Sequence, residues 1–284
     1  MKEMLPTHPE KESAVYLGRH SISSYATNKK ILSENPQGPM DPDHQIIPDL
    51  APEGRELAEH EAEAFFDQLN PETDSLFLVS SDQARALETA NIYRKVAKKR
   101  GFEIIKPKHT KSELAEEIGE GEIRTVEGLS LNIRNMLAHH AFVPEGKVED
   151  IRWDTVSPEM KTRWEKARAI IRKHDYGSWG ANFFHHSEKI SKLFPEDEIR
   201  TAQELYDTEF QNLLRLIRFA HKKMEEAESP KNIKVLGFGH ENYLGIALDT
   251  YFHEHAIGNC EMIRFQVEDG SISMSAKGQE KVIT

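Results

Sequence analysis

The sequence has little cysteine, no long apolar run and no excess of positive charge. Cys260 is the only cysteine among 284 residues, which excludes an intrachain disulfide and a zinc site built on paired thiolates. We therefore expect a reducing compartment. The polar segment 1–13 lacks the apolar core of a secretory signal, which favours the cytoplasm. No stretch approaches the ~18 apolar residues that a membrane-spanning helix requires, so we expect no membrane partner.

The balance of charge further limits the classes of partner that we expect. The net charge of −11 disfavours nonspecific binding to nucleic acid. Charged residues make up 30% of the chain and hydrophobic residues 38%, which is typical of a soluble globular protein and not of a disordered one. A small anionic ligand would therefore have to be attracted by a local basic pocket.

Two segments that lie far apart in the chain each end a strand-like apolar run with a histidine. Residues 14–20 end in Arg19-His20, and residues 233–240 end in glycines followed by His240. Short, apolar, glycine-bounded runs are typical of buried parallel strands, and open α/β sheets bind ligands at the carboxyl ends of such strands. We expect both histidines to face one crevice.

A third apolar run, residues 76–81, leads into a helical pattern. Asp82 is the predicted N-cap of this helix, and Arg85 then falls in its first turn. A cation there opposes the helix dipole, so its position favours an anionic partner. An arginine fork beside the N–H groups of a helix start predicts a phosphate or carboxylate site.

Four motifs stand out, namely Leu17-Gly18-Arg19-His20, Pro52-Glu53-Gly54-Arg55-Glu56-Leu57-Ala58, Ser80-Ser81 with Arg85-Ala86 and Thr89-Ala90, and Gly239-His240. In their order and spacing they resemble the histidine phosphatase (phosphoglycerate mutase-like) superfamily. The matched pieces span residues 14–121 and about 230–252. The resemblance implies an α/β fold, namely a three-layer α/β/α sandwich with a mostly parallel sheet. It also implies a metal-independent hydrolysis of phosphomonoesters.

The chain also departs from the family pattern. Ser21 and Ala26 stand where the family usually has glycine and often has asparagine, and Glu241 follows the second histidine where glycines are common. Ser23 and Tyr25 fit the usual hydroxyl and aromatic positions. These differences concern substrate contacts more than the core chemistry.

The resemblance implies a role for each matched residue. His20 is the expected nucleophile, because a neutral imidazole that attacks phosphorus divides a difficult displacement into two easier steps. A hydrogen bond from its other ring nitrogen to a backbone carbonyl would fix the tautomer. Arg19, Arg85 and His240 are expected to donate to the phosphoryl oxygens, with Ser23 as a further phosphate-binding residue. The structural alternatives are a packed core histidine and surface ion pairs.

The acid that protonates the leaving group is expected in the segment 113–121. Leu114-x-Glu116 fits one half of the family pattern and Glu117-Ile118 the other, so the register is ambiguous by one residue. We favour Glu116 narrowly over Glu117. A solvated surface charge is the alternative for either residue.

The histidine pairs do not predict a metal. The pairs 139–140, 185–186 and 253/255 lack a His-Glu-x-x-His frame and supporting cysteines. Adjacent histidines on a helix point about 100° apart and cannot easily share one ion. We therefore expect neither metal nor cofactor, and we expect His185 or His186 to line the mouth of a pocket.

The remaining pattern predicts one histidine phosphatase-like domain over residues 1–284. Its core would be residues 14–121 and 201–284, and the aromatic, basic segment 122–200 would be a helical insertion that acts as a lid. The resulting hypothesis is a phosphatase acting on a small phosphorylated substrate. A phosphoglycerate mutase-like phosphotransferase and an idle phospho-ligand-binding protein are the alternatives. The predicted elements are a loop over 21–51, helices over 52–69, 83–99, 201–228 and 242–252, strands over 102–105 and 233–237, and a hairpin of 262–267 with 271–274.

Overall fold

The fold is taken from a computed structural model of the protein. None of the helices in the part of the chain that it describes is both long and apolar enough to cross a membrane. The described residues are 12–23, 50–106, 122–126, 129, 157–171, 173, 176, 182, 185–194, 204, 208, 210–227, 229–254 and 256–284.

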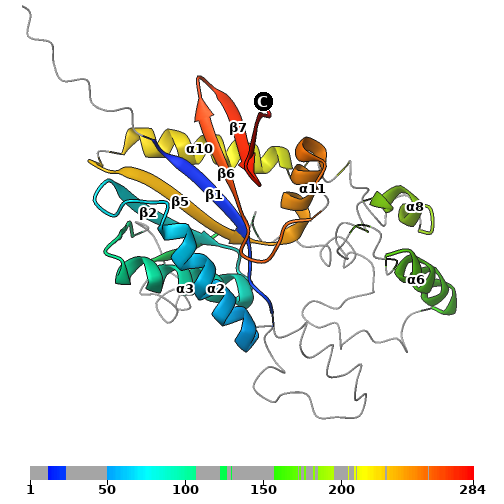
Figure 1. The fold of residues 1–284 in the computed structure, drawn as a ribbon. Helices are drawn as coiled ribbons and strands as arrows, with labels where there is room; N and C mark the ends of the chain where they lie inside the picture. Colours follow the sequence, from blue (N-terminus) through cyan, green and yellow to red (C-terminus); the bar gives the residue numbers. More distant parts are fainter. Residues whose placement is uncertain are drawn as a thin grey trace, which may run out of the picture.

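One eight-stranded sheet forms the centre of the fold, in the order β3-β2-β5-β1-β6-β7-β8, with β4 also paired to β2 (Figure 1). Its central strands β2, β5 and β1 are parallel, and β6 to β8 continue the sheet as an antiparallel meander. The mixed α/β fold predicted from the sequence is thereby confirmed. The strands are β1 (Ala14–Arg19), β2 (Asp74–Ser80), β3 (Glu103–Ile104), β4 (Ile123–Thr125), β5 (Asn232–Gly239), β6 (Met262–Glu268), β7 (Ser271–Ala276) and β8 (Gln279–Val282).

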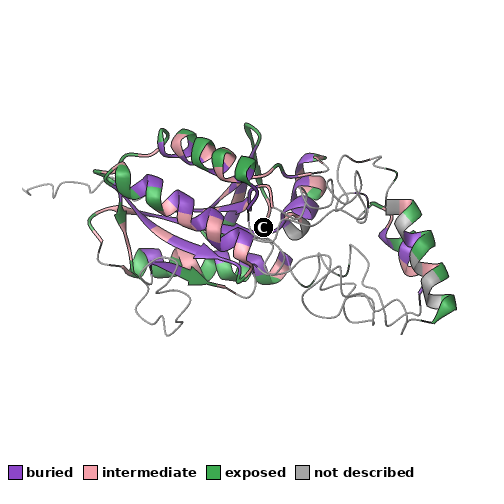
Figure 2. Cartoon of the chain, turned by 90° about the horizontal axis from the view of Figure 1, so that it is seen from below, coloured by how far each residue is buried: buried purple, intermediate pink, exposed green. Residues whose placement is uncertain are grey.

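Helices cover both faces of this sheet, as a three-layer sandwich requires. On one face, α2 (Pro52–Phe66) and α3 (Ala84–Lys99) pack on Leu236 and Phe238 of β5. On the other, α10 (Gln211–Glu226) and α11 (Glu241–Phe252) pack on Ile233 and Val235 of the same strand. Successive side chains of a strand point to opposite faces, so residues 235–239 of β5 are apolar without interruption because they are buried on both. Figure 2 shows the buried sides of these helices turned toward the sheet.

Two further helices, α6 (Pro158–Ile171) and α8 (Ser187–Ser191), lie apart from these layers. In Figure 1 both helices lie to the side of the sheet toward which β1 runs. Within the segment 122–200, which the sequence predicts to be a helical insertion, residues 158–171 and 187–191 are helical. Residues 123–125 form β4, which pairs parallel to β2. Residues 123–125 therefore belong to the sheet and not to a helix.

Two other boundaries differ from the sequence expectation. Helix α2 ends at Phe66 and not near residue 69. Strand β8 was not predicted, because Gln279–Val282 is a short edge strand whose residues are all exposed and lack the alternation of a half-buried strand. The terminal hairpin is confirmed as β6 and β7, and the strand and helix expected around His240 are confirmed as β5 and α11.

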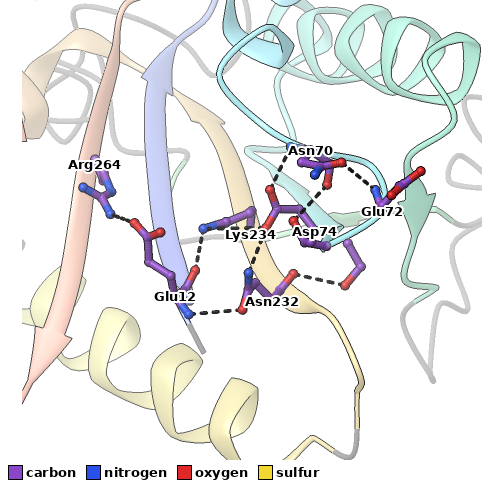
Figure 3. Close-up of polar contacts among 9 residues, drawn as sticks. Glu12, Asn70, Glu72, Asp74, Asn232, Lys234 and Arg264 are labelled. Carbon is purple, nitrogen blue, oxygen red and sulfur yellow. Dashed lines mark hydrogen bonds and ion pairs between the residues drawn. The ribbon is translucent and has the colours of Figure 1, made fainter. Parts of the chain in front are cut away.

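A polar network around the buried Lys234 and Asp74 lies at the amino ends of the parallel strands (Figure 3). Lys234 of β5 donates to the backbone carbonyl of Glu12, and its ammonium lies 3.9 Å from a carboxylate oxygen of Asp74 on β2. Asn232 donates to the same carboxylate at 3.1 Å, and Arg264 of β6 pairs with Glu12. Burial lowers the pKa of Lys234, so these partners offset the cost of burying its charge. The network ties the parallel strands β2 and β5 and the start of β1 to the antiparallel β6, at the end of the sheet opposite the carboxyl ends of the three parallel strands.

Candidate functional site

The carboxyl ends of the three parallel strands bring the predicted residues together. His20 follows β1, His240 follows β5, and Arg85 lies on the helix that follows β2. The two imidazole ring centroids are 5.1 Å apart. Backbone bonds continue the pairing past the strand ends, with His20 N–H donating to Gly239 O and Ser81 N–H to Phe238 O, each at 2.9 Å. The expectation that both histidines face one place is confirmed.

His20 is held as a neutral imidazole with a defined tautomer. Its Nδ1–H donates to the carbonyl of Ser21 at 2.6 Å, which is the kind of bond that the sequence analysis required. Its Nε2 accepts a hydrogen bond from Nε of Arg85 at 3.0 Å. Burial lowers the pKa of His20 well below its usual value, and the charges of Arg85 and Arg19 lower it further, while the Ser21 bond acts in the opposite sense. The ring is therefore unprotonated at Nε2, where a nucleophile needs its lone pair.

Arg85 bonds to both histidines in the cluster formed by His20, Arg85 and His240. It lies in the first turn of α3, as predicted, and is buried. Besides the bond to His20, its Nη2 donates to Nδ1 of His240 at 3.2 Å. The predicted N-cap Asp82 is wrong, because Gln83 occupies that position without a side-chain cap. Instead, the hydroxyl of Ser81 accepts from the Gln83 N–H at 3.3 Å.

His240 is also held through both ring nitrogens. An arginine N–H can only donate, so Nδ1 of His240 accepts from Arg85 and the ring proton lies on Nε2. That Nε2–H then donates to the hydroxyl of Ser81, 3.1 Å away. Only 3% of His240 is exposed, so the pair of bonds satisfies a buried ring. Ser81 was singled out within a motif, but its contact with His240 was not predicted.

Arg19 extends the cationic character of the site toward α11. Its Nη1 donates to the carbonyl of Ile257 at 2.9 Å, and its Nη2 lies 3.2 Å from a carboxylate oxygen of Glu241. Its Nε–H is buried and has no hydrogen-bond partner within the described part of the chain. Nε and Nη2 are the side-on pair of donors with which arginine binds an oxyanion in a bidentate manner.

The segment after His20 is fixed against α2 and α3. The buried Ser21 hydroxyl donates to the carbonyl of Gly54 at 2.7 Å, and Ser21 N–H donates to the hydroxyl of Thr89 at 3.1 Å. A Cβ on Gly54 would lie 2.1 Å from the carbonyl oxygen of Ile22, so α2 can approach this segment only with glycine at that position. This close approach explains the glycine of the motif over residues 52–58. Ser21, a departure from the family pattern, is a structural anchor here.

The segment between α11 and β6 holds the other side of the nucleophile. The amide of Asn259 donates to the carbonyl of His20 at 2.8 Å, and Cys260 N–H donates to the carbonyl of Arg19 at 3.0 Å. Burial raises the pKa of Cys260 to about 11, so this thiol is a packing group and not a second nucleophile. Asn259 was missed from the sequence, because nothing near it in the chain indicates a contact with His20.

The other predicted site residues are not joined to the cluster. Glu116 and Glu117 lie outside the described residues, as do Tyr25 and Ala26. Ser23 pairs through its backbone with Leu50, and in the described part of the chain no hydrogen bond links its side chain to the cluster.

Histidine pairs and other potential ligands do not form a metal centre in the described ranges. There, no group of three or more His, Cys, Asp or Glu side chains lies close enough together to hold an ion. His185 instead stacks on Tyr176, with ring centroids 3.7 Å apart, and its Nε2 lies 3.2 Å from Asp249 of α11. His185 thus connects the segment around α8 to the helix that begins beside the cluster.

Comparison with known proteins gave results at the level of structure only. No protein-family model matches the chain, and no curated protein matches it in sequence. Similar solved structures include YhfR from Bacillus stearothermophilus, 14% identical, covering 94% of this chain and 97% of that one, with a TM-score of 0.45. Phosphoserine phosphatase from Entamoeba histolytica in complex with 3-phosphoglyceric acid is 17% identical, covers 93% and 95%, and has a TM-score of 0.44. Mycobacterial glucosyl-3-phosphoglycerate phosphatase is 12% identical, covers 95% and 97%, and has a TM-score of 0.42.

Proposed function

We propose that the protein is a phosphatase of the histidine phosphatase superfamily that hydrolyses phosphomonoesters through a phosphohistidine on His20. The observation that carries this proposal is the state of His20. Its Nδ1–H is committed to the Ser21 carbonyl, and its unprotonated Nε2 points to the guanidinium of Arg85. A neutral imidazole set against two arginines matches what nucleophilic attack on an anionic phosphoryl group requires.

In the first step, Nε2 of His20 attacks phosphorus and the ester P–O bond breaks. The leaving oxygen takes a proton from a carboxylic acid, for which Glu116 and Glu117 remain the candidates. In the second step, water attacks the phosphohistidine, the P–N bond breaks, and the same carboxylate takes a proton from the water. Inorganic phosphate leaves and His20 returns to its neutral form.

Binding of the phosphoryl group would rearrange the donors. Without substrate, Nε–H of Arg85 donates to the lone pair that must attack. A phosphoryl oxygen is a charged acceptor and competes well for this N–H, because charge-assisted hydrogen bonds are about twice as strong as neutral ones. Arrival of the substrate thus frees the nucleophile. The buried Nε–H of Arg19 is available to a second phosphoryl oxygen, and the Nε2–H of His240 can turn from Ser81 to a third.

The direct test is hydrolysis of p-nitrophenyl phosphate by the purified protein, with and without a chelator. The proposal predicts turnover that the chelator leaves unchanged. A protein that binds phosphate but shows no turnover with any phosphomonoester would contradict it. Incubation with a phosphoglycerate adds a separate outcome, because recovery of an isomeric phosphoglycerate in place of inorganic phosphate would identify a phosphotransferase.

We further propose that the chain is one domain, and that the predicted insertion, taken to begin after β4, selects the substrate. The contact of His185 with Asp249 supports this, because it links the α8 region to α11. His185→Ala is expected to preserve the rate with p-nitrophenyl phosphate and to change the ranking of larger phosphate esters, since remote contacts act through binding energy. An unchanged ranking would identify this contact as packing only.

A further inference from the structure

Glu241 introduces a negative charge beside the proposed phosphoryl site. It is the first residue of α11 and follows His240 directly, where the resembling family commonly has glycine. Its Oε2 lies 3.2 Å from Nη2 of Arg19, and the two side chains are 12% and 24% exposed. A partly buried pair of this kind interacts more strongly than an exposed one, because solvent screens it less.

The pair changes the charge that the site offers to a ligand. Among the described residues, the charged or titratable groups of this cluster include Arg19 from β1, His20, Arg85 from α3, His240, Glu241 and the neutral thiol of Cys260. The hydrogen-bond pattern makes both imidazoles neutral, so the carboxylate of Glu241 offsets one of the two arginine charges among these described residues. A doubly charged phosphoryl group therefore meets less positive charge here than the two arginines alone would offer.

The position of the carboxylate also matters. Glu241 holds Nη2 of Arg19, one of the two donors with which that arginine would bind a phosphoryl oxygen. An unprotonated oxygen arriving there meets a like charge, whereas a P–OH group can donate its hydrogen to the carboxylate and accept from Nε–H of Arg19.

Resting on the phosphatase function proposed above, we propose that Glu241 is a specificity-determining residue that selects the singly charged, protonated form of the phosphoryl group. The substrate class is then a phosphomonoester bound as its monoanion. The second pKa of a phosphomonoester is about 6, so this form dominates on the acidic side of neutrality. The lowered pKa of His20 is compatible with this choice, because the nucleophile stays neutral there.

Steady-state kinetics with p-nitrophenyl phosphate between about pH 5 and 8 test this assignment, because that range spans the second pKa of the ester. In the unaltered protein KM should rise above about pH 6 as the monoanion disappears. Glu241→Gln should remove most of this rise and lower KM at about pH 8 by tenfold or more, since a like charge no longer opposes the dianion. Glu241→Asp keeps the charge and should keep the rise.

A matched control is Glu63→Gln. Glu63 accepts from Nη1 of Arg100 at 3.1 Å, close to the spacing of the Arg19–Glu241 pair, but Arg100 caps the end of α3 opposite to Arg85. This variant should keep the original dependence of KM on pH. A Glu241→Gln protein that is folded and active but follows the original curve, or whose KM at the alkaline end increases, would overturn the selection by charge and leave the phosphatase function standing.

Binding of inorganic phosphate separates this proposal from the proposed function. Titration calorimetry on the unaltered protein and Glu241→Gln needs no turnover. The variant should bind phosphate at least tenfold more tightly at about pH 8 and by a smaller factor at about pH 5.5, where phosphate carries a single charge. If the unaltered protein and Glu241→Gln bound phosphate with equal affinity at each of the two pH values, the role of Glu241 would be overturned, even if the protein proved not to be a phosphatase.

Discussion

Nε of Arg85 donates a 3.0 Å hydrogen bond to Nε2 of His20, the atom that the proposed mechanism uses as its nucleophile. The same guanidinium reaches Nδ1 of His240 through Nη2. One arginine in the first turn of a helix therefore bonds to the residues that follow β1 and β5. It also donates to the Nε2 lone pair of His20 that the mechanism uses. It lowers the pKa of His20 through its charge, after the larger effect of burial.

Replacement of Arg85 should affect both binding and the nucleophile. Arg85→Ala removes a donor aimed at developing charge, so kcat/KM with phosphomonoesters should fall by roughly 10²- to 10³-fold. The pKa of His20 should rise, because one of the charges that depress it is gone, and NMR titration of the imidazole would measure this. Arg100→Ala, at the other end of α3, is the control and should change neither quantity. An unchanged pKa of His20 in Arg85→Ala would contradict the coupling.

The leaving-group acid can be located by comparing esters. General acid catalysis contributes roughly 10²- to 10⁴-fold, so loss of the acid should slow alkyl phosphates far more than p-nitrophenyl phosphate, whose phenolate leaves without a proton. We expect this pattern for one of Glu116→Gln and Glu117→Gln, with Glu116 favoured. Small and equal effects of both substitutions would place the acid elsewhere in the chain.

The buried neutral state of His20 predicts how stability depends on pH. The folded-state pKa lies below the unfolded value of about 6.5, so the unfolded chain binds an extra proton as the pH falls through that value. The contribution of His20 to the free energy of unfolding should therefore be fully present above about pH 6.5. Below that pH it should decrease, by at most ~1.4 kcal/mol per pH unit. Urea unfolding of His20→Asn should show a shallower decrease. Parallel curves would indicate that the pKa of His20 is not lowered in the folded protein.

The contact between Gly54 and Ile22 predicts a stability effect at a distance from the chemistry. A Cβ at residue 54 meets a backbone carbonyl at 2.1 Å, so Gly54→Ala must displace the segment that carries Ser21. We expect a loss of about 1–3 kcal/mol of unfolding free energy, as for other overpacked sites, together with reduced kcat. Gly245→Ala is the matched control, because the nearest atom outside its own helix backbone is 3.8 Å away and alanine favours a helix. Equal stability of the two variants would contradict the close approach.

The sequence predicted those parts of the site that lie at strand ends. His20, Arg85 and His240 each follow an apolar run with a clear local pattern, and the parallel pairing of β2, β5 and β1 then brings them together. The burial of β5 on both faces likewise shows in the unbroken apolar run over residues 235–239.

The parts that escaped prediction depend on tertiary contacts. Asn259 reaches the His20 carbonyl across 239 residues of sequence, and no local pattern records such a bond. Strand β4 has only three residues, of which Ile123 alone is buried, so its alternation is too short to recognise. Asp82 has the side chain of an N-cap, but the helix begins one residue later and the hydroxyl of Ser81 bonds to the Gln83 N–H instead.

The central claim, a phosphohistidine on His20, is tested most directly by brief exposure of the protein to a ³²P-labelled phosphomonoester followed by rapid quenching. We predict label that is lost in acid and retained in base, that maps to the peptide containing His20, and that is absent from folded His20→Ala together with turnover. A folded His20→Ala protein that keeps near-normal turnover, or label that survives acid and maps to another residue, would contradict the mechanism.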